Sequence, residues 1–167
     1  VILIHDLLPL RIKSSLELSI YHYFYVPLVV KNSSKVICNS LTTAKEVSKK
    51  LKVPDNKLEV IKLGFNKVNF KVLNLEREPF MLLICRHTPH KNIPKVLKAF
   101  SIFKKINKSF SDYKLKIAGS FNRIHTPNYK RLGQELNLNK CIDWLDWISE
   151  SEKINLLNRC KALIVPS

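Results

Sequence analysis

The chain has 167 residues, enough for one average domain or for parts of two. Its 29 Lys and Arg residues outnumber its 13 Asp and Glu residues, and the net charge of +16 attracts anions such as nucleic acid, acidic membrane surfaces and phosphorylated substrates. No apolar stretch approaches the ~20 residues of a membrane span and no signal peptide is recognisable, so we expect a cytoplasmic protein, at most peripheral at the inner face of the membrane.

Short apolar runs alternate with helix-spaced apolar stripes along the chain, a pattern typical of strands alternating with helices. Several runs are apolar almost throughout, as is usual for parallel strands that are covered on both faces. The strands are expected at residues 1–4, 35–38, 58–63, 80–85, 113–118, 141–145 and 162–165. The sequence therefore predicts the α/β class with parallel sheets.

Three helices have readable start signals. Residues 43–46, Thr-Ala-Lys-Glu, fit a capping box for the first of them. The second is expected to begin at Asn92, with Pro94 in its first turn and apolar residues at three-and-four spacing behind it. The third follows Ser149 or Ser151, either of which could cap it.

The stretch from residue 64 to residue 79 is polar and charged and has no strong periodicity. We therefore expect a boundary between two sheets there, with one domain at residues 1–75 and a second at residues 76–167. The chain begins at Val1 inside an expected strand and ends directly after another, so we expect both domains to be incomplete.

Polar residues follow three of the expected strands. In doubly wound sheets ligands bind beyond the carboxyl ends of the strands. The polar strand ends are His5-Asp6, residues 86–92 and Gly119-Ser120. A histidine at a strand end is more often structural than catalytic, and this interpretation of His5 stays open beside the functional one.

Residues 86–92 join a buried strand to a helix start and include Arg86 and Lys91. A diphosphate suits this place, because a helix start offers N–H groups and about half a positive charge, while an arginine fork and a lysine ammonium bind phosphate oxygens. The alternative is a loop that is basic only because the whole protein is basic. Spacing alone does not decide between the two.

Other kinds of site have little support in the sequence. The four cysteines are far apart and lack zinc-ligand spacing, so we interpret Cys38, Cys85, Cys141 and Cys160 as core thiols in a reducing compartment. No Walker loop, G-x-G-x-x-G, zinc motif or Ser-His-Asp order occurs, and only three glycines are present. We expect no metal and no cofactor.

Three segments in the first part of the chain resemble the glycosyltransferases known as family 4 or group 1, whose members have two facing Rossmann-like domains (the GT-B fold). Residues 5–7 (His-Asp-Leu) are similar to a histidine–acid strand end of that family, and residues 38–40 (Cys-Asn-Ser) to its strand–serine–helix unit. Residues 58–66 are similar to the strand that leads into its linker.

The second part of the chain resembles the same family more closely. Residues 82–86 and 90–93 look like its strand, phosphate arginine and Lys-Asn helix start. Residues 115–120 are similar to its Ile-Ala-Gly strand end, and residues 162–167 to its Val-Pro-Ser segment. The match runs through nearly the whole chain and implies two Rossmann-like domains with parallel sheets.

The resemblance implies a retaining, metal-independent transferase that moves a sugar from a nucleoside-diphosphate sugar to a saccharide or lipid-linked acceptor hydroxyl, in cell-envelope polysaccharide or glycolipid synthesis. It implies catalytic roles for His5, Arg86 and Lys91, with His5 beside the transferred sugar. The implied donor-binding residues are Arg86, Lys91, Asn92, Gly119 and Ser120. Peripheral membrane association fits the charge, and no nucleic-acid partner is expected.

Two departures from the family pattern keep other functions open. Cys85 replaces the glycine usual before the phosphate arginine, and Asp146 replaces a second glycine after residues 144–145. The resemblance also places a glutamate pair after Ser167 and an acceptor loop before Val1, so the chain alone is expected to be inactive. The alternatives are a non-catalytic partner subunit with the same fold and a basic nucleic-acid-binding module.

Overall fold

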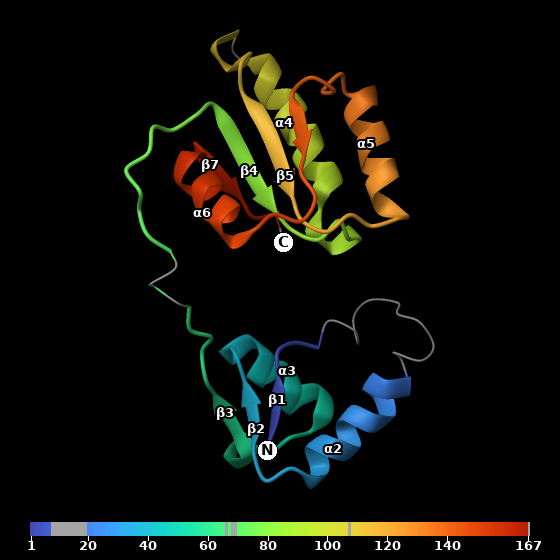
Figure 1. The fold of residues 1–167 in the computed structure, drawn as a ribbon. Helices are drawn as coiled ribbons and strands as arrows, with labels where there is room; N and C mark the ends of the chain where they lie inside the picture. The colour runs from blue at the N-terminus through green and yellow to red at the C-terminus, as the bar shows by residue number, and fades with distance from the viewer. Residues whose placement is uncertain (8–19, 66, 68–69, 107, 167) are drawn as a thin grey trace. The chain divides into compact units, whose positions relative to one another are not determined.

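The computed structural model describes residues 1–7, 20–65, 67, 70–106 and 108–166 (Figure 1). The chain divides into two compact units, Val1–Asn66 and Lys67–Ser167. The division falls inside the stretch 64–79, where the sequence loses its periodicity. We refer to the two parts as unit 1 and unit 2.

Unit 1 is built on a small parallel sheet with the order β1-β2-β3. The strands are β1 (Ile2–Ile4), β2 (Val36–Cys38) and β3 (Leu58–Val60), and the helical segments are η2 (Tyr21–Tyr25), α2 (Val26–Asn32), α3 (Leu41–Leu51) and η3 (Asp55–Lys57). The core forms where Val36 and Cys38 of the central strand meet Val30 of α2 and Val47 of α3, all of them buried.

The start of α3 differs from the predicted capping box. The helix begins at Leu41, and the extended residue Ser40 caps it, because its hydroxyl accepts a hydrogen bond of 3.1 Å from the Thr43 amide. Thr43 lies inside the first turn, where its buried hydroxyl is 3.2 Å from the His5 carbonyl oxygen. The assignment of Thr43 as the first residue of the box was therefore wrong by one helical turn.

Unit 2 contains a second parallel sheet, with the order β6-β5-β4-β7 (Figure 1). The strands are β4 (Phe80–Ile84), β5 (Lys114–Ala118), β6 (Ile142–Trp144) and β7 (Ala162–Ile164). The helical segments are η4 (Pro89–Lys91), α4 (Ile93–Ile106), η5 (Lys108–Phe110), α5 (His125–Glu135) and α6 (Glu150–Arg159). The predicted α/β class with parallel sheets is confirmed.

Helices cover both faces of the sheet in unit 2. Successive residues of a strand point to opposite faces, and in β4 both Leu82 and Leu83 are buried. Leu83 packs in the cluster that contains Leu97 of α4 and Tyr129 of α5, whereas Leu82 packs with Leu156 of α6. This burial on both faces explains why β4 is apolar throughout.

The third helix start is a complete capping box. Ser149 accepts a hydrogen bond of 3.2 Å from the Glu152 amide, and the Glu152 carboxylate accepts one of 2.9 Å from the Ser149 amide. The bond from the Ser149 amide and a further one of 2.9 Å from the Ser149 hydroxyl to the same carboxylate lower the pKa of Glu152 below its ordinary value. Of the two predicted caps, Ser149 is correct.

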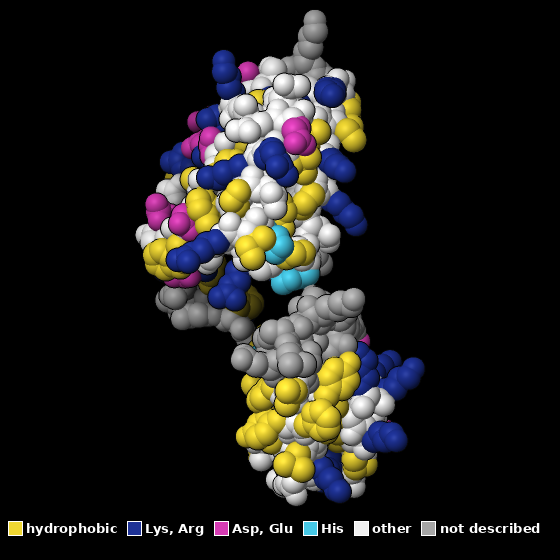
Figure 2. Space-filling view, turned by 90° about the vertical axis from the view of Figure 1, so that its right-hand side faces the viewer, with side chains coloured by type: hydrophobic (Ala, Val, Ile, Leu, Met, Phe, Trp, Pro, Cys, Tyr) yellow, Lys and Arg dark blue, Asp and Glu magenta, His cyan; other side chains and the backbone are white. Residues whose placement is uncertain are grey.

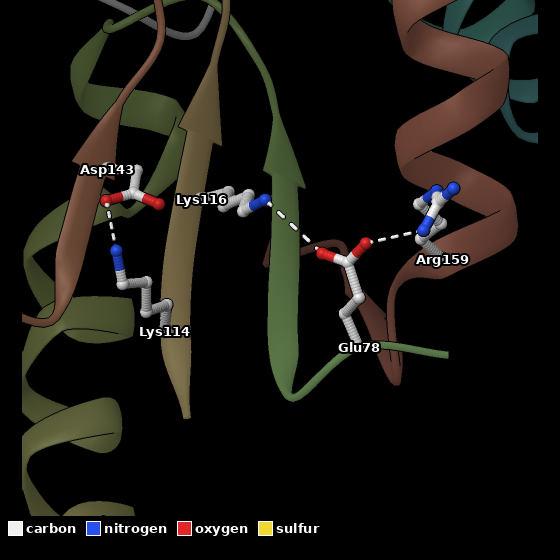
Figure 3. Close-up of polar contacts among 5 residues, drawn as sticks. All are labelled: Glu78, Lys114, Lys116, Asp143 and Arg159. Atoms are coloured by element: carbon white, nitrogen blue, oxygen red, sulfur yellow. Dashed lines mark hydrogen bonds and ion pairs between the residues drawn. The ribbon is translucent and has the colours of Figure 1, made fainter. Parts of the chain in front are cut away.

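Ion pairs join the chain before β4 to α6 and to β5, and join β5 to β6 (Figure 3). The Glu78 carboxylate accepts a hydrogen bond of 2.7 Å from Arg159 and lies 3.9 Å from the Lys116 ammonium on β5. Lys114 and Asp143 pair across β5 and β6 at 3.3 Å. These partly exposed pairs lie at the edge of the sheet away from the predicted site, so we assign them a structural role.

The four cysteines are free thiols, of which Cys38 and Cys160 are buried and Cys85 and Cys141 are half-buried. Over the described residues, no helix has both the length and the apolar character needed to cross a membrane.

Candidate functional site

The carboxyl ends of β4 and β5 are held side by side by backbone hydrogen bonds. The Cys85 amide donates to the Ala118 carbonyl at 2.9 Å, and the His87 amide donates to the Ser120 carbonyl at 3.2 Å. Arg86 lies between these two bonds in the sequence. The structure therefore brings Arg86 next to the Gly119-Ser120 turn, two parts of the predicted donor site that are far apart in the chain.

Gly119 allows this close approach. Its φ is +130°, a conformation that residues with a side chain rarely adopt, and a Cβ added there would lie 2.1 Å from the Cys85 carbonyl oxygen. Ser120, the next residue, is exposed. Glycine is thus required at this strand end by the neighbouring backbone of β4.

Arg86 is exposed and Lys91 is half-exposed, and within the described part of the chain neither side chain has a hydrogen bond or an ion pair. Lys91 lines an open cavity of about 320 Å³ beyond the carboxyl ends of β4 and β7. Ile84, Cys85, Lys153 and Pro166 are among the other residues of its wall. Both cations are therefore available for an anionic ligand at this edge of the sheet.

The pKa of the Cys85 thiol is affected by burial and by the nearby charge of Lys91. Burial raises the pKa of this thiol above its ordinary value, and the positive charge of Lys91 opposes the rise. The second ammonium of the cavity, that of Lys153, is 2.6 Å from a Glu150 carboxylate oxygen and 5.2 Å from the centre of the Phe70 ring. Lys91 is therefore the better candidate for binding an anion there.

The beginning of α4 offers fewer amide donors than the sequence suggests. The amides of Lys91 and Asn92 already donate to the carbonyls of Thr88 and Pro89, and Pro94 has no N–H. The Lys95 amide donates to the Asn92 carbonyl at 2.9 Å. The helix start contributes chiefly its dipole, so direct contacts to a ligand fall to side chains.

Asn92 has a structural partner. It has a φ of +50°, and its side-chain amide donates a hydrogen bond of 3.1 Å to the Pro166 carbonyl. This bond ties the start of α4 to the segment after β7. The predicted contact of Asn92 with the donor stays a prediction, and any such contact has to coexist with this bond.

His5 belongs to unit 1, where it is exposed directly after β1. Together with Asp6, Leu7 and Tyr21 it lines an open hollow of about 210 Å³. The remaining predicted site residues all belong to unit 2. The predicted role of His5 beside the transferred sugar stays a prediction.

The structure reveals one residue of this region that sequence reasoning missed. His87, directly after Arg86, is fully buried, and its ring lies among those of Phe121, Tyr129 and Trp144, with centroid distances of 5.2, 6.5 and 5.7 Å. In the sequence, His87 is marked only by its place directly after Arg86 at the end of a buried strand. A histidine at such a place can be buried or exposed, so the sequence does not predict its burial.

Asp146 also has a structural task. Its backbone carbonyl accepts a hydrogen bond of 3.1 Å from the Gly119 amide, and its carboxylate accepts one of 3.4 Å from the Phe121 amide. Asp146 thus holds the turn after β5 from the side of β6. Of the two contacts, only the one made by the carboxylate depends on the replacement of glycine by aspartate.

Positive charge is not concentrated at this edge. In Figure 2, Lys and Arg side chains are spread over the visible face of unit 2, with hydrophobic and acidic side chains between them. A nucleic-acid surface usually gathers its cations in one patch or stripe. Among the residues that the structure describes, the visible face of unit 2 shows no such patch or stripe.

The family described as "Glycosyl transferases group 1" matches residues 65–167, more than half of the chain and all of unit 2. The sequence has no match among curated proteins.

Several solved structures share the fold. A sucrose-phosphate synthase from Thermosynechococcus elongatus is 20% identical with a TM-score of 0.77, over 99% of this chain and 43% of that one. Anabaena HepE, in complex with UDP and glucose, is 16% identical with a TM-score of 0.76, over 97% and 45% of the two chains. A Rickettsia africae glycosyltransferase is 23% identical with a TM-score of 0.68, over 89% and 41%. The chain thus spans less than half of each of these structures.

Proposed function

Because the chain belongs to the family of glycosyl transferases group 1, we propose that it is part of an enzyme that moves a sugar from a nucleoside-diphosphate sugar to an acceptor hydroxyl with retention of configuration. The observation that carries the proposal is the placement of Arg86 and Lys91. Both cations lie at the carboxyl edge of the sheet without a counter-ion among the described residues, and Arg86 is adjacent to the Gly119-Ser120 turn. Ligands of doubly wound sheets bind at this edge.

The proposed chemistry makes the leaving diphosphate the centre of the site. As the bond between the sugar and the diphosphate breaks, positive charge develops on the sugar and negative charge on the phosphate oxygens. The Arg86 guanidinium can bind two of these oxygens as a fork, and the Lys91 ammonium adds a point charge. In this proposal the two side chains provide the charge stabilisation that a metal ion provides in other transferases.

The remaining parts of the proposal concern the acceptor side. His5 is proposed to lie beside the transferred sugar, and a saccharide or a lipid-linked molecule of the cell envelope is proposed as acceptor. The net charge of +16 favours a peripheral position at an anionic membrane, where such acceptors are found. Pelleting with acidic but not with neutral vesicles would support this position.

Nucleotide binding tests the proposal directly. We expect UDP or GDP to bind the chain saturably at 0.15 M NaCl, with one site by calorimetry and little loss of affinity at moderately higher salt. UDP is the first nucleotide to test, because HepE was solved with UDP and glucose. A single-stranded oligonucleotide serves as the comparison, since binding through scattered lysines falls steeply with salt. Salt-sensitive oligonucleotide binding without nucleotide binding would contradict the proposal and favour a nucleic-acid module.

A non-catalytic partner subunit is the second candidate function. It is favoured by Asp146, which occupies a position where the family usually has glycine and whose carboxylate accepts a hydrogen bond from the Phe121 amide in the turn after β5. Such a subunit would keep the fold and could retain nucleotide binding. Sugar transfer by the protein that contains this chain distinguishes the two: turnover supports the enzyme, and nucleotide binding without turnover supports the subunit.

A further inference from the structure

The buried ring of His87 has one satisfied nitrogen and one unsatisfied nitrogen. Nδ1 lies 3.0 Å from the hydroxyl oxygen of Thr126 on α5. Nε2 is buried, and none of the residues that the structure describes gives it a hydrogen-bond partner. A buried polar atom without a partner is unusual and costs free energy.

The hydrogen bonds of Thr126 indicate where the proton of His87 resides. The Thr126 oxygen accepts a bond of 2.7 Å from the Asn122 amide, so its own proton is free to be donated to Nδ1. This arrangement leaves only Nε2–H unpaired. With the proton on Nδ1 instead, both the Thr126 proton and the Nε2 lone pair would lack a partner among the described residues. The neutral Nε2–H form therefore satisfies more groups.

His87 contacts the turn after β5 in three ways. Its amide donates to the Ser120 carbonyl at 3.2 Å, and its ring packs against the Phe121 ring at 5.2 Å. Through the Thr126 hydroxyl it is also linked to the Asn122 amide. A single residue thus connects the loop that carries Arg86 to the turn 119–122, with its backbone amide on Ser120 and its ring on Phe121 and, through Thr126, on Asn122.

We propose that His87 is a positioning residue of the nucleotide site, whose neutral Nε2–H imidazole holds the turn 119–122 against the Arg86 loop through Phe121 and Asn122 and whose protonation releases that turn. This inference rests on the proposed function for the identity of the ligand. The hold on the turn itself is a property of the chain and is measurable without any ligand.

Protonation weakens the hold for a local reason. An imidazolium would place a positive charge and two N–H donors in a pocket of aromatic rings, and Nδ1 could no longer accept from Thr126. The titratable groups around the ring are Lys130 and Tyr129 on α5 and Asp146 after β6. Burial lowers the pKa of His87, Asp146 opposes this effect, and Lys130 adds to it.

The direction of the pH effect follows from this lowered pKa. A released turn exposes the ring and returns its pKa toward the ordinary value of 6.5, so the released form binds the proton more tightly. The hold is therefore complete above about pH 6.5 and is lost as the pH falls through the lower pKa of the buried ring.

The test measures two quantities: the protonation state of the His87 ring nitrogens and the affinity of the chain for a nucleotide probe. Long-range ¹⁵N NMR of the 167-residue chain at pH 8 should show the Nε2–H form, and the Ser120 and Phe121 amides should shift together with His87 titration. UDP-glucose is the nucleotide probe, because neither of its esterified phosphates titrates near pH 6. We expect its affinity to fall severalfold between pH 8 and pH 5.5, because the released turn binds the proton more tightly than the held turn does.

Two substitutions separate positioning from simple packing. His87→Asn keeps an acceptor where Nδ1 lies and cannot titrate, so it should bind UDP-glucose at pH 8 nearly as the wild type does and lose the pH dependence. His87→Leu fills the pocket without an acceptor and should bind more weakly at both pH values. His125→Asn, at the first position of α5, is the matched control and should keep the wild-type pH profile.

The outcomes distinguish this inference from the proposed function. One outcome is that neither UDP-glucose nor another nucleotide binds at pH 8, while the ring is in the Nε2–H form and the turn amides follow its titration. This outcome would contradict the proposed nucleotide ligand but would support the positioning role of His87. A Nδ1–H ring, or turn amides that ignore the titration of His87, would overturn the positioning role whatever binds. An unchanged pH profile in His87→Asn would overturn the protonation switch.

Discussion

Replacing Arg86 with alanine is expected to slow sugar transfer about 100- to 1,000-fold while leaving the fold intact. Arg86 is exposed and has no partner among the described residues, so its removal costs the folded state little. A donor aimed at charge that develops in the transition state typically contributes about 2.7–4 kcal/mol, which corresponds to this loss of rate. The measurement is kcat/KM of the transferase, together with the melting temperature of the variant.

Two further variants sharpen this prediction. Arg86→Lys keeps the charge but loses the two-pronged hydrogen bonding, so its rate should lie between those of the wild type and Arg86→Ala. Arg131→Ala removes the same charge from the exposed face of α5, where Arg131 is 3.8 Å from Glu135, and should have a near-normal rate. If Arg86→Ala and Arg131→Ala lose equal amounts of rate, Arg86 would act only through its contribution to the net charge and not through contact with the diphosphate.

Replacing Gly119 with alanine is expected to destabilise unit 2 by about 2–6 kcal/mol and to abolish nucleotide binding. The added Cβ would lie 2.1 Å from the Cys85 carbonyl oxygen, a backbone atom held in the sheet, and the φ of +130° disfavours any side chain. Backbone strain and overpacking each cost about 1–3 kcal/mol. This sum is a large part of the stability of a small domain, and chemical denaturation would measure it.

Gly133→Ala is the matched control for this substitution. Gly133 lies in α5, where an added Cβ would meet the end of the Ile142 side chain at 3.2 Å, and alanine favours the helix by about 1 kcal/mol over glycine. Its stability should stay close to that of the wild type. A Gly119→Ala protein that unfolds at the wild-type denaturant concentration would show that the turn after β5 is free to move away from β4.

The sequence predicted the strands of unit 2 well because both faces of its sheet are covered. Leu82 and Leu83 face opposite sides and are both buried, so β4 appears as a continuous apolar run. The order of the strands was beyond prediction from the pattern alone. It places β7 beside β4 and β6 at the other edge, and it is determined by contacts between distant segments.

The sequence pattern predicted the wrong cap for α3, because tertiary contacts determine which residue caps this helix. Residues 43–46 match a capping box as well as residues 149–152 do, but the hydroxyl of Thr43 lies against the His5 carbonyl and Ser40 caps the helix instead. Only the position of β1 distinguishes the two cases. A sequence pattern contains no information on that position.

The candidate site was predictable in part for the same reason. Arg86 and Gly119 follow apolar runs directly, and parallel strands bring such positions to one edge of the sheet. The burial of His87 was not predictable, because it depends on rings from α5 and β6 that surround it. The bond from Asn92 to Pro166 likewise joins residues that are 74 positions apart in the chain.

Mapping the bound nucleotide on the amide spectrum of the chain tests the central claim most directly. On addition of UDP, we expect the largest shifts at the amides of residues 86–93 and 119–120, with loss of these shifts in Arg86→Ala. The amides at the opposite edge of the sheet, around Glu78, should stay unchanged. Saturable binding with its largest shifts away from Arg86 and Lys91 would contradict a diphosphate site at the junction of β4 and α4.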